Sequence, residues 1–344
     1  MTQTFTPPST ANAVKNQRIV SLDIAKAICI ILVVIGHYVP DNSPDWYVMI
    51  HDVIYTFHMP LFMFASGYVY IATKKEVPYG EFLLKKVKRL MVPYFATSAI
   101  VISIKLVTQG GMSVDNPVTV LSFVKMFYQP EAGYFLWFIW ALWWMFVLVP
   151  LFKKKQSRIL LFAVGLLLHF LPLGLTKVFS VHEFSLMLVW FMLGIMAFET
   201  EWLHRFLQSF SYMKVAVASV CFACGEGVYL MRCTTFMGFR MILSAIGIWF
   251  IIEVSKCICK GWTEVRKGHL LMVVSVSGYI IYLFHTTFEG FTKAIVRKLP
   301  IDTDMWYVFV PSVIVVVAAG VMVPIVLHRC VLNRFKLTRV LFGL

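Results

Sequence analysis

Charged side chains are scarce in this sequence. Asp, Glu, Lys and Arg together make up 14% of the 344 residues, whereas apolar and aromatic residues make up 60%. A soluble protein of this size needs more polar surface to cover its core, but a chain surrounded by lipid does not. The composition therefore excludes an ordinary soluble domain and predicts an all-α polytopic membrane protein.

Acidic residues are especially few, 17 against 31 Lys and Arg, and the net charge is +14. We expect no nucleic-acid partner, because the basic residues are not gathered into one patch with interleaved aromatic residues. Most of them lie in alternate loops, on the side that carries the N-terminus. Because cytoplasmic loops are enriched in Lys and Arg, this bias predicts cytoplasmic termini and an even number of membrane spans.

Three further signals are absent. The seven cysteines lie mostly within or beside apolar runs, and this odd number predicts neither a disulfide framework nor a zinc site. No small-residue cleavage pattern follows the first apolar run, so we expect a retained helix rather than a signal peptide. No internal repeat of the kind that marks many transporters is visible.

About ten apolar runs are long enough to cross a bilayer, at roughly 20 residues each. We predict one membrane domain over residues 18–330, between a disordered cytoplasmic tail at 1–17 and a basic cytoplasmic tail at 331–344. The predicted membrane helices run near residues 19–39, 52–73, 90–108, 133–152, 158–175, 180–200, 210–231, 236–258, 270–290 and 306–328.

Ionisable residues inside such helices are costly, so each is a candidate functional group. On the first predicted helix, Lys26 and His37 lie on one face, within about 20° of each other and about 16 Å apart along the axis. Asp23 precedes Lys26 by one turn and can pair with it near the cytoplasmic end. Lys26 and His37 therefore mark the two ends of one polar stripe, with His37 in the outer half of the membrane.

Two more histidines are expected at a similar depth. His58 lies on the second helix just before Pro60, which frees a backbone carbonyl and bends the helix. His285 lies on the ninth helix, one turn before Glu289. A neutral imidazole can accept a proton from a hydroxyl, so this grouping indicates general-base catalysis of acyl transfer. Zinc ligation is the alternative, but the spacing does not favour it and no metal is predicted.

Several other polar features have both a structural and a functional interpretation. The segment "LKKVKRLMVP", which contains Lys86 and Arg89, can bind phosphates or can simply anchor the third helix at the inner face. Trp137 belongs to an aromatic belt and could also stack on a sugar. His169 and Glu226 also fall in outer halves, and as isolated groups they are interpreted as structural.

The segment "RIVSLDIAKAICIILVVIGH" resembles the signature opening of the membrane-bound acyltransferase-3 family, and in particular its bacterial fucose 4-O-acetylase-like branch. The family pattern is a basic residue, ten further residues and a catalytic histidine, which here become Lys26 and His37. The resemblance continues in order to about residue 328, through "FHMPLFMFASGY", "KVKRLMVPY", "YFLWFIWALWW", "WFMLGIMAFE" and "SGYIIYLFH". Many members have arginine where this chain has Lys26, and Lys86 replaces the first arginine of an Arg-x-x-Arg pair that ends at Arg89.

The resemblance implies transfer of an acetyl group from cytoplasmic acetyl-CoA, a donor substrate rather than a bound cofactor, across the bacterial inner membrane. The acceptor would be a sugar hydroxyl of a cell-surface or lipid-linked glycan, as in exopolysaccharide biosynthesis. The phosphates of acetyl-CoA would rest on Lys86 and Arg89, and its pantetheine arm would run along the Lys26 face. Lysine in place of arginine keeps the charge but loses the planar fork for phosphate.

At the reaction centre, the resemblance implies His37 as the base, with His58 or His285 orienting it or stabilising the oxyanion. An acyl-histidine intermediate is equally open. Trp137 and Glu289 are the candidate residues for acceptor binding. A different class, a transporter or flippase of a lipid-linked sugar, would also explain ten helices with polar groups inside the membrane.

Overall fold

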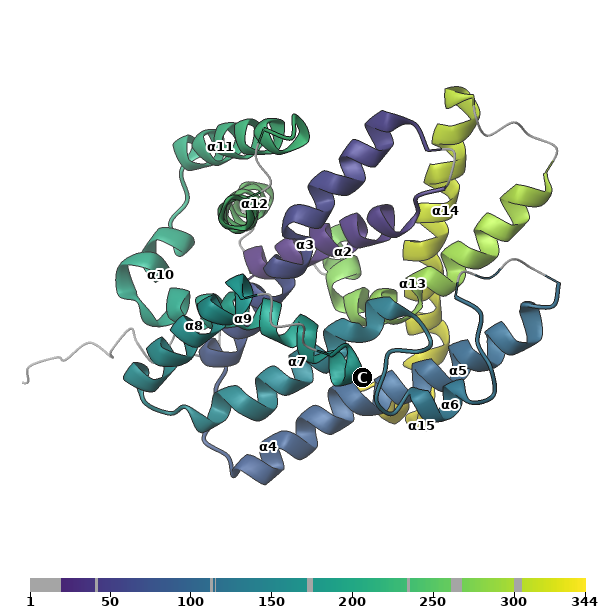
Figure 1. Cartoon of the computed structure of the whole chain (residues 1–344), viewed down its shortest axis with the longest axis horizontal. Coiled ribbons are helices and arrows are strands. Elements are labelled where there is room, and N and C mark those ends of the chain that lie inside the picture. Colours follow the sequence, from purple (N-terminus) through teal and green to yellow (C-terminus); the bar gives the residue numbers. More distant parts are fainter. Residues whose placement is uncertain are drawn as a thin grey trace, which may run out of the picture.

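A computed structural model describes residues 20–40, 43–111, 114, 116–171, 176–233, 236–260, 268–299 and 305–344. The tail predicted at 1–17 lies outside these ranges. Every regular element in them is helical. The α-helices, numbered as in Figure 1, are α2 (Val20–His37), α3 (Asp45–Ala72), α4 (Tyr79–Lys86), α5 (Val92–Thr108), α6 (Ser122–Lys125), α7 (Trp137–Leu148), α8 (Lys155–Phe170), α9 (Val181–Glu199), α10 (Glu201–Gln208), α11 (Tyr212–Leu230), α12 (Met237–Ile258), α13 (Leu270–Lys298), α14 (Trp306–Leu327) and α15 (Lys336–Leu341).

Within the described residues, nine helices are long and apolar enough to cross a membrane. Each of the ten predicted runs contains a helix, but α8 has only 16 residues. At about 1.5 Å per residue it is about 24 Å long, shorter than the hydrocarbon layer of about 30 Å. The chain is thus an all-α polytopic membrane protein, and α8 accounts for the difference between nine and ten.

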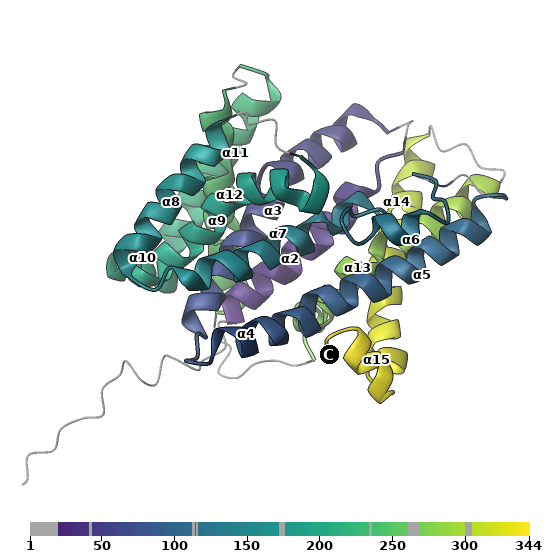
Figure 2. The same cartoon turned by 60° about the horizontal axis from the view of Figure 1, so that its bottom comes forward.

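Three helices extend beyond their apolar runs. Helix α3 begins at Asp45, although the apolar pattern starts at residue 52, and α13 continues to Lys298, past the predicted end at 290. Helices α4 and α5 join through the π-helical turn η2 (Val87–Met91) into one long rod (Figure 2). A hydropathy window underestimates these lengths because it stops at the first polar turn, whereas the backbone hydrogen bonds continue.

Helix α2 lies at the centre of the molecule, between two apolar clusters (Figure 1). Leu22, Ala25 and Cys29 pack into one cluster with α3, α9 and α12. Ile30 and Val34 belong to the other, with α5, α13 and α14. Because α2 is apolar on both faces, its own packing fixes where its last residue, His37, lies.

Helices α3 and α9 approach each other through glycine. A Cβ atom placed on Gly67 would lie 1.9 Å from the carbonyl oxygen of Phe191, and one on Gly194 would lie 2.0 Å from that of Phe64. In lipid, helices associate by close packing rather than by the hydrophobic effect, and small residues allow that contact. This contact holds α3, which carries His58, against the bundle.

The end of the bundle opposite His37 is also ordered by polar contacts. The Tyr279 hydroxyl lies 3.4 Å from the Leu90 carbonyl oxygen in η2. His328, in a second π-helical turn, η6 (His328–Leu332), is 2.8 Å from Ser277 through Nδ1. The segment 331–344, predicted as a basic tail, includes α15 and buries Phe342, which is 3% exposed.

Candidate active site

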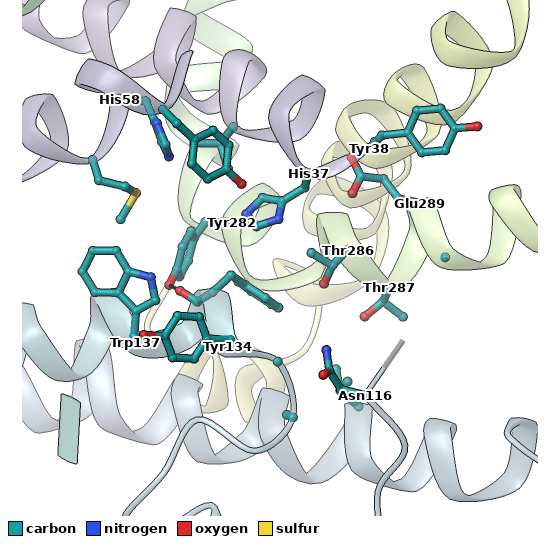
Figure 3. Close-up of a pocket in the computed structure, with 18 of the residues that line it drawn as sticks. His37, Tyr38, His58, Asn116, Tyr134, Trp137, Tyr282, Thr286, Thr287 and Glu289 are labelled. Carbon is teal, nitrogen blue, oxygen red and sulfur yellow. Dashed lines mark hydrogen bonds between the residues drawn. The ribbon is translucent and has the colours of Figure 1, made fainter. Parts of the chain in front are cut away.

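A cavity of about 800 Å³ lies at the His37 end of the bundle. It is lined by residues of α2, α3, α5, α7, α8, α9, α12 and α13, together with the segment that leads into α7 (Figure 3). Ligand sites of this size, mostly apolar with a few polar groups, are typical of small-molecule recognition. Helices from both halves of the chain therefore contribute to one concave site.

His37 is the last residue of α2 and its side chain is exposed to this cavity. In the last turn of the helix, the Ile35 carbonyl oxygen accepts hydrogen bonds from the Tyr38 amide at 3.3 Å and from the Tyr47 hydroxyl at 3.1 Å. Gly36 leaves room for Tyr55, whose ring would approach a Cβ at that position to 2.9 Å. The imidazole of His37 is thus held by a capped helix end and can still reach a bound molecule.

His285 lies behind His37 and is fully buried. Its ring centroid is 5.0 Å from that of His37, and it is not among the residues that line the cavity. Nδ1 lies 2.9 Å from the carbonyl oxygen of Tyr282 and 3.1 Å from that of Ile281. Since carbonyls only accept, Nδ1 carries the proton and Nε2 keeps a lone pair. Nε2 has no partner among the described residues.

His58 lines the cavity on the α3 side and is 4% exposed. Its Nδ1 donates to the Ile54 carbonyl oxygen at 2.7 Å. The ring of Tyr55 lies between the histidines, 4.7 Å from His58 and 6.5 Å from His37 between centroids. The structure therefore brings His37 and His285 into direct contact and places His58 on the same cavity, with Tyr55 between them.

Pro60 has the local effect expected from the sequence. A proline ring cannot donate, which leaves the Thr56 carbonyl without its helical partner. The Ser244 hydroxyl of α12 donates to that carbonyl at 2.5 Å. The Thr56 hydroxyl lies 2.6 Å from Glu226 Oε1, which fixes α11 to α3 and agrees with a structural role for Glu226.

The two residues predicted to bind the acceptor substrate, Trp137 and Glu289, both line the cavity (Figure 3). Trp137 begins α7, beside Tyr134, which hydrogen-bonds the Glu183 carboxylate. Glu289 is 5% exposed, and its Oε1 has no hydrogen-bond partner among the described residues. It lies against α14 at Gly320, where a Cβ would come within 3.1 Å of Oε1. The Glu289 carboxylate does not orient His285, whose Nδ1 is held by backbone carbonyls instead.

The three predicted donor-binding residues are not part of this cavity. Lys26 pairs with Asp23 at 2.9 Å, as expected from their spacing. Lys86 places its Nζ 3.6 Å from the centroid of the Phe146 ring, and Arg89 is exposed on η2. The predicted path from these residues to His37 is therefore not formed by the described cavity, whose lining lies at the other end of α2.

Sequence reasoning missed several lining residues. His169 faces the cavity, with Nδ1 2.9 Å from the Leu186 carbonyl oxygen, although it was interpreted as isolated. Tyr55 was not predicted as a site residue, because an aromatic side chain in an apolar helix usually contributes to packing alone. Thr287 has a buried hydroxyl without a partner among the described residues. Within those residues no group of three His, Cys, Asp or Glu side chains is placed to hold a metal ion.

The fold and the site define a polytopic membrane protein with a histidine pair at an internal cavity. Residues 19–329 match the family model described as an acyltransferase domain, in the acyltransferase-3 family. The chain therefore belongs to this family.

Two similar proteins are both named nodulation protein NolL. That of Sinorhizobium fredii (strain NBRC 101917 / NGR234) is 29% identical over 170 residues, which cover 47% of this chain and 45% of that protein. That of Mesorhizobium japonicum (strain LMG 29417 / CECT 9101 / MAFF 303099) is 28% identical over 168 residues, 47% of this chain and 43% of its own. The alignments thus span less than half the length of these relatives. No solved structure matches the chain.

Proposed function

We propose that this membrane protein is an acyltransferase, which transfers an acetyl group from cytoplasmic acetyl-CoA to a sugar hydroxyl of a cell-surface or lipid-linked glycan in the bacterial inner membrane. The observation that carries the proposal is the pair formed by His37, exposed to the cavity, and His285, buried behind it with a free Nε2 lone pair. An accessible imidazole backed by a second one is suited to moving a proton to and from a hydroxyl.

In the proposed mechanism, an unprotonated nitrogen of His37 accepts the proton of the acceptor hydroxyl while the sugar oxygen attacks the thioester carbonyl. The tetrahedral intermediate then expels the coenzyme A sulfur, which takes the proton back from the His37 imidazolium. The products are the O-acetyl ester and free coenzyme A. His58, on the same wall, has its Nδ1 proton committed to the Ile54 carbonyl, so its Nε2 can accept a hydrogen bond from the acceptor sugar and orient it.

His285 acts through His37 rather than on the substrate. Its Nδ1 proton is committed to backbone carbonyls, so its Nε2 can only accept, and the nearest ring is that of His37. The described structure has no hydrogen bond between the two rings, and we propose that one forms when the substrate binds. His285 Nε2 would then accept from the nitrogen of His37 that does not face the substrate and so set the tautomer of the base. It is a positioning residue in this proposal.

His285→Ala should therefore lower kcat by on the order of 10²-fold while the KM values for donor and acceptor stay within about twofold. Initial rates in detergent, measured over both substrate concentrations, separate the two parameters. His328→Ala is the matched control, because His328 is also a buried histidine, 4% exposed, but it lies at the opposite end of the bundle. A change in KM without a change in kcat would contradict the positioning role.

The transfer itself is tested with inside-out membrane vesicles that contain the chain or lack it. Vesicles are given acetyl-CoA labelled in the acetyl group, and the label recovered in alkali-labile glycan esters is counted. We expect label only where the chain is present. Equal label in both preparations would remove the proposal for that glycan.

The cytoplasmic donor site is proposed from Lys86 and Arg89. Arg89→Gln should raise the KM for acetyl-CoA about tenfold, because it removes a charge-assisted contact to phosphate, and Arg89→Lys should give a smaller increase. The KM for the acceptor should not change. Lys153→Gln is the control, an exposed lysine in another loop on the predicted cytoplasmic side. Equal KM values for acetyl-CoA in all these variants would place the donor elsewhere.

A further inference from the structure

Positive charge gathers in the cavity at the His37 end. Among its described lining residues, five side chains carry a permanent positive charge, and Glu289 is the one carboxylate. The five are Lys105, Arg240, Lys293, Arg297 and Lys298. The described part of the cavity wall is therefore electropositive, apart from the position next to the histidines.

These cations come from three separate helices. On α13, Glu289, Lys293 and Arg297 follow one another at intervals of four residues, so they form a stripe on one face. Arg240 lies on α12 and Lys105 on α5. The guanidinium of Arg240 lies 5.8 Å from the centroid of the Tyr229 ring, and the side chains of Arg240 and Arg297 are both exposed. Both residues line the same cavity, and they come from different helices.

Membrane topology does not account for this concentration of charge. The positive-inside bias leaves few Lys and Arg at this end of the bundle, and most of those few line the cavity. Of the others, Lys125 lies 3.5 Å from Glu131, and Lys177 lies over the ring of Tyr134. Cations that are retained where the topology disfavours them, and that line a cavity, indicate an anionic ligand.

Building on the acyl transfer proposed above, we propose that the acceptor is an anionic saccharide, with carboxylate or phosphate groups bound by Arg240 and Arg297. The planar guanidinium fork matches both anions. Arg297 lies 12 residues beyond His285, about 18 Å along the helix axis. The acidic group therefore binds away from the reacting hydroxyl, which requires an oligosaccharide rather than a single sugar.

Glu289 gives the bound saccharide a direction. It lies between the histidines and the cations on α13, with a buried carboxylate oxygen that has no hydrogen-bond partner among the described residues. An unpartnered carboxyl oxygen at this position accepts a hydrogen bond from a sugar hydroxyl, which an acidic group cannot replace. The hydroxyl end of the saccharide is therefore favoured toward His37, and the acidic end toward Arg297.

The test uses the full chain in nanodiscs of neutral phosphatidylcholine and two probes, trigalacturonic acid and its carboxyl-reduced form, galactotriose. Thermophoresis measures binding without turnover. We expect the wild-type chain to bind the triacid at least about tenfold more tightly than the neutral trisaccharide at low salt, with a smaller preference at high salt. Arg240→Gln/Arg297→Gln should lose about tenfold in affinity for the triacid and should bind galactotriose and acetyl-CoA as before.

The matched control is Lys125→Gln/Arg232→Gln, which removes two positive charges from the same end of the bundle but outside the cavity lining. It should keep the preference for the triacid. The single variants Arg240→Lys and Arg297→Lys keep the charge and should retain more affinity than the glutamine variants. If the double variant folds poorly, the affinities of these single variants for the triacid still test the role of each arginine.

Equal binding of the two trisaccharides, or binding of neither, would overturn the proposal, as would an equal loss in the control pair. Loss of acetyl-CoA affinity in the arginine pair, with the saccharide unaffected, would overturn it too, because the cations would then hold the donor phosphates. The binding result does not depend on turnover. Absence of acetyl transfer would remove the proposed function alone, whereas transfer without a preference for the acid would remove only this inference.

Discussion

His37→Ala should reduce acetyl transfer by about 10²–10⁴-fold, because it removes the proposed general base, which lines the described cavity at the end of α2. The remaining rate would come from binding. His37→Gln should be equally inactive, since an amide can hydrogen-bond a hydroxyl but cannot take its proton. Labelled acetyl recovered in the ester product measures both rates directly.

His182→Ala is the matched control for these variants. His182 lies on α9 and is half-exposed, but it does not line the cavity. Its substitution should leave the rate within about twofold of wild type. A His37→Ala chain that folds, binds acetyl-CoA and keeps a third of the wild-type rate would show that the proton is taken by another group.

Gly67→Ala or Gly194→Ala should destabilise the bundle by more than about 3 kcal/mol, beyond the usual cost of overpacking a core. The new Cβ would lie 1.9 Å or 2.0 Å from a backbone carbonyl oxygen of the facing helix. A backbone atom cannot move aside as a flexible side chain can, so α3 and α9 would have to separate. Thermal unfolding in detergent and the yield of monodisperse protein measure the loss.

Gly278→Ala is the control for both glycine variants. Gly278 lies inside α13, and a Cβ atom added there would meet nothing within 4 Å, so alanine should be neutral or should stabilise the helix by up to about 1 kcal/mol. If the three alanine variants had the same melting temperature, the close packing of α3 on α9 would not be a determinant of stability.

Periodicity explains why part of the site could be predicted. Lys26 and His37 repeat on one face of a helix, and the alternating direction of the helices placed His58 and His285 at the depth of His37. The pairing of Asp23 with Lys26 followed from their spacing. Each of these statements depends only on position along a helix and on the order of the helices, and both are written in the sequence.

The rest of the site depends on contacts between helices, which no single helix encodes. The sequence did not distinguish the role of His285 from that of His58. In the structure, the packing of α13 against α2 buries His285 behind His37, whereas His58 lies on the cavity wall. Arg240 and Arg297 were not singled out in the sequence, because only the tertiary structure shows that both line one cavity. The predicted span at 158–175 also differs from α8, which runs from Lys155 to Phe170, because hydropathy alone does not mark where a helix ends.

The size of the cavity also affects how much of the thioester is lost to hydrolysis. At about 800 Å³ it has room for many water molecules, each of which takes up about 30 Å³ in the liquid. A base that can deprotonate a sugar can deprotonate water, so space that the acceptor leaves unfilled admits hydrolysis of the thioester. Release of coenzyme A thiol alone therefore overstates productive turnover, and the ratio of ester formed to thiol released reports how completely an acceptor displaces solvent around His37.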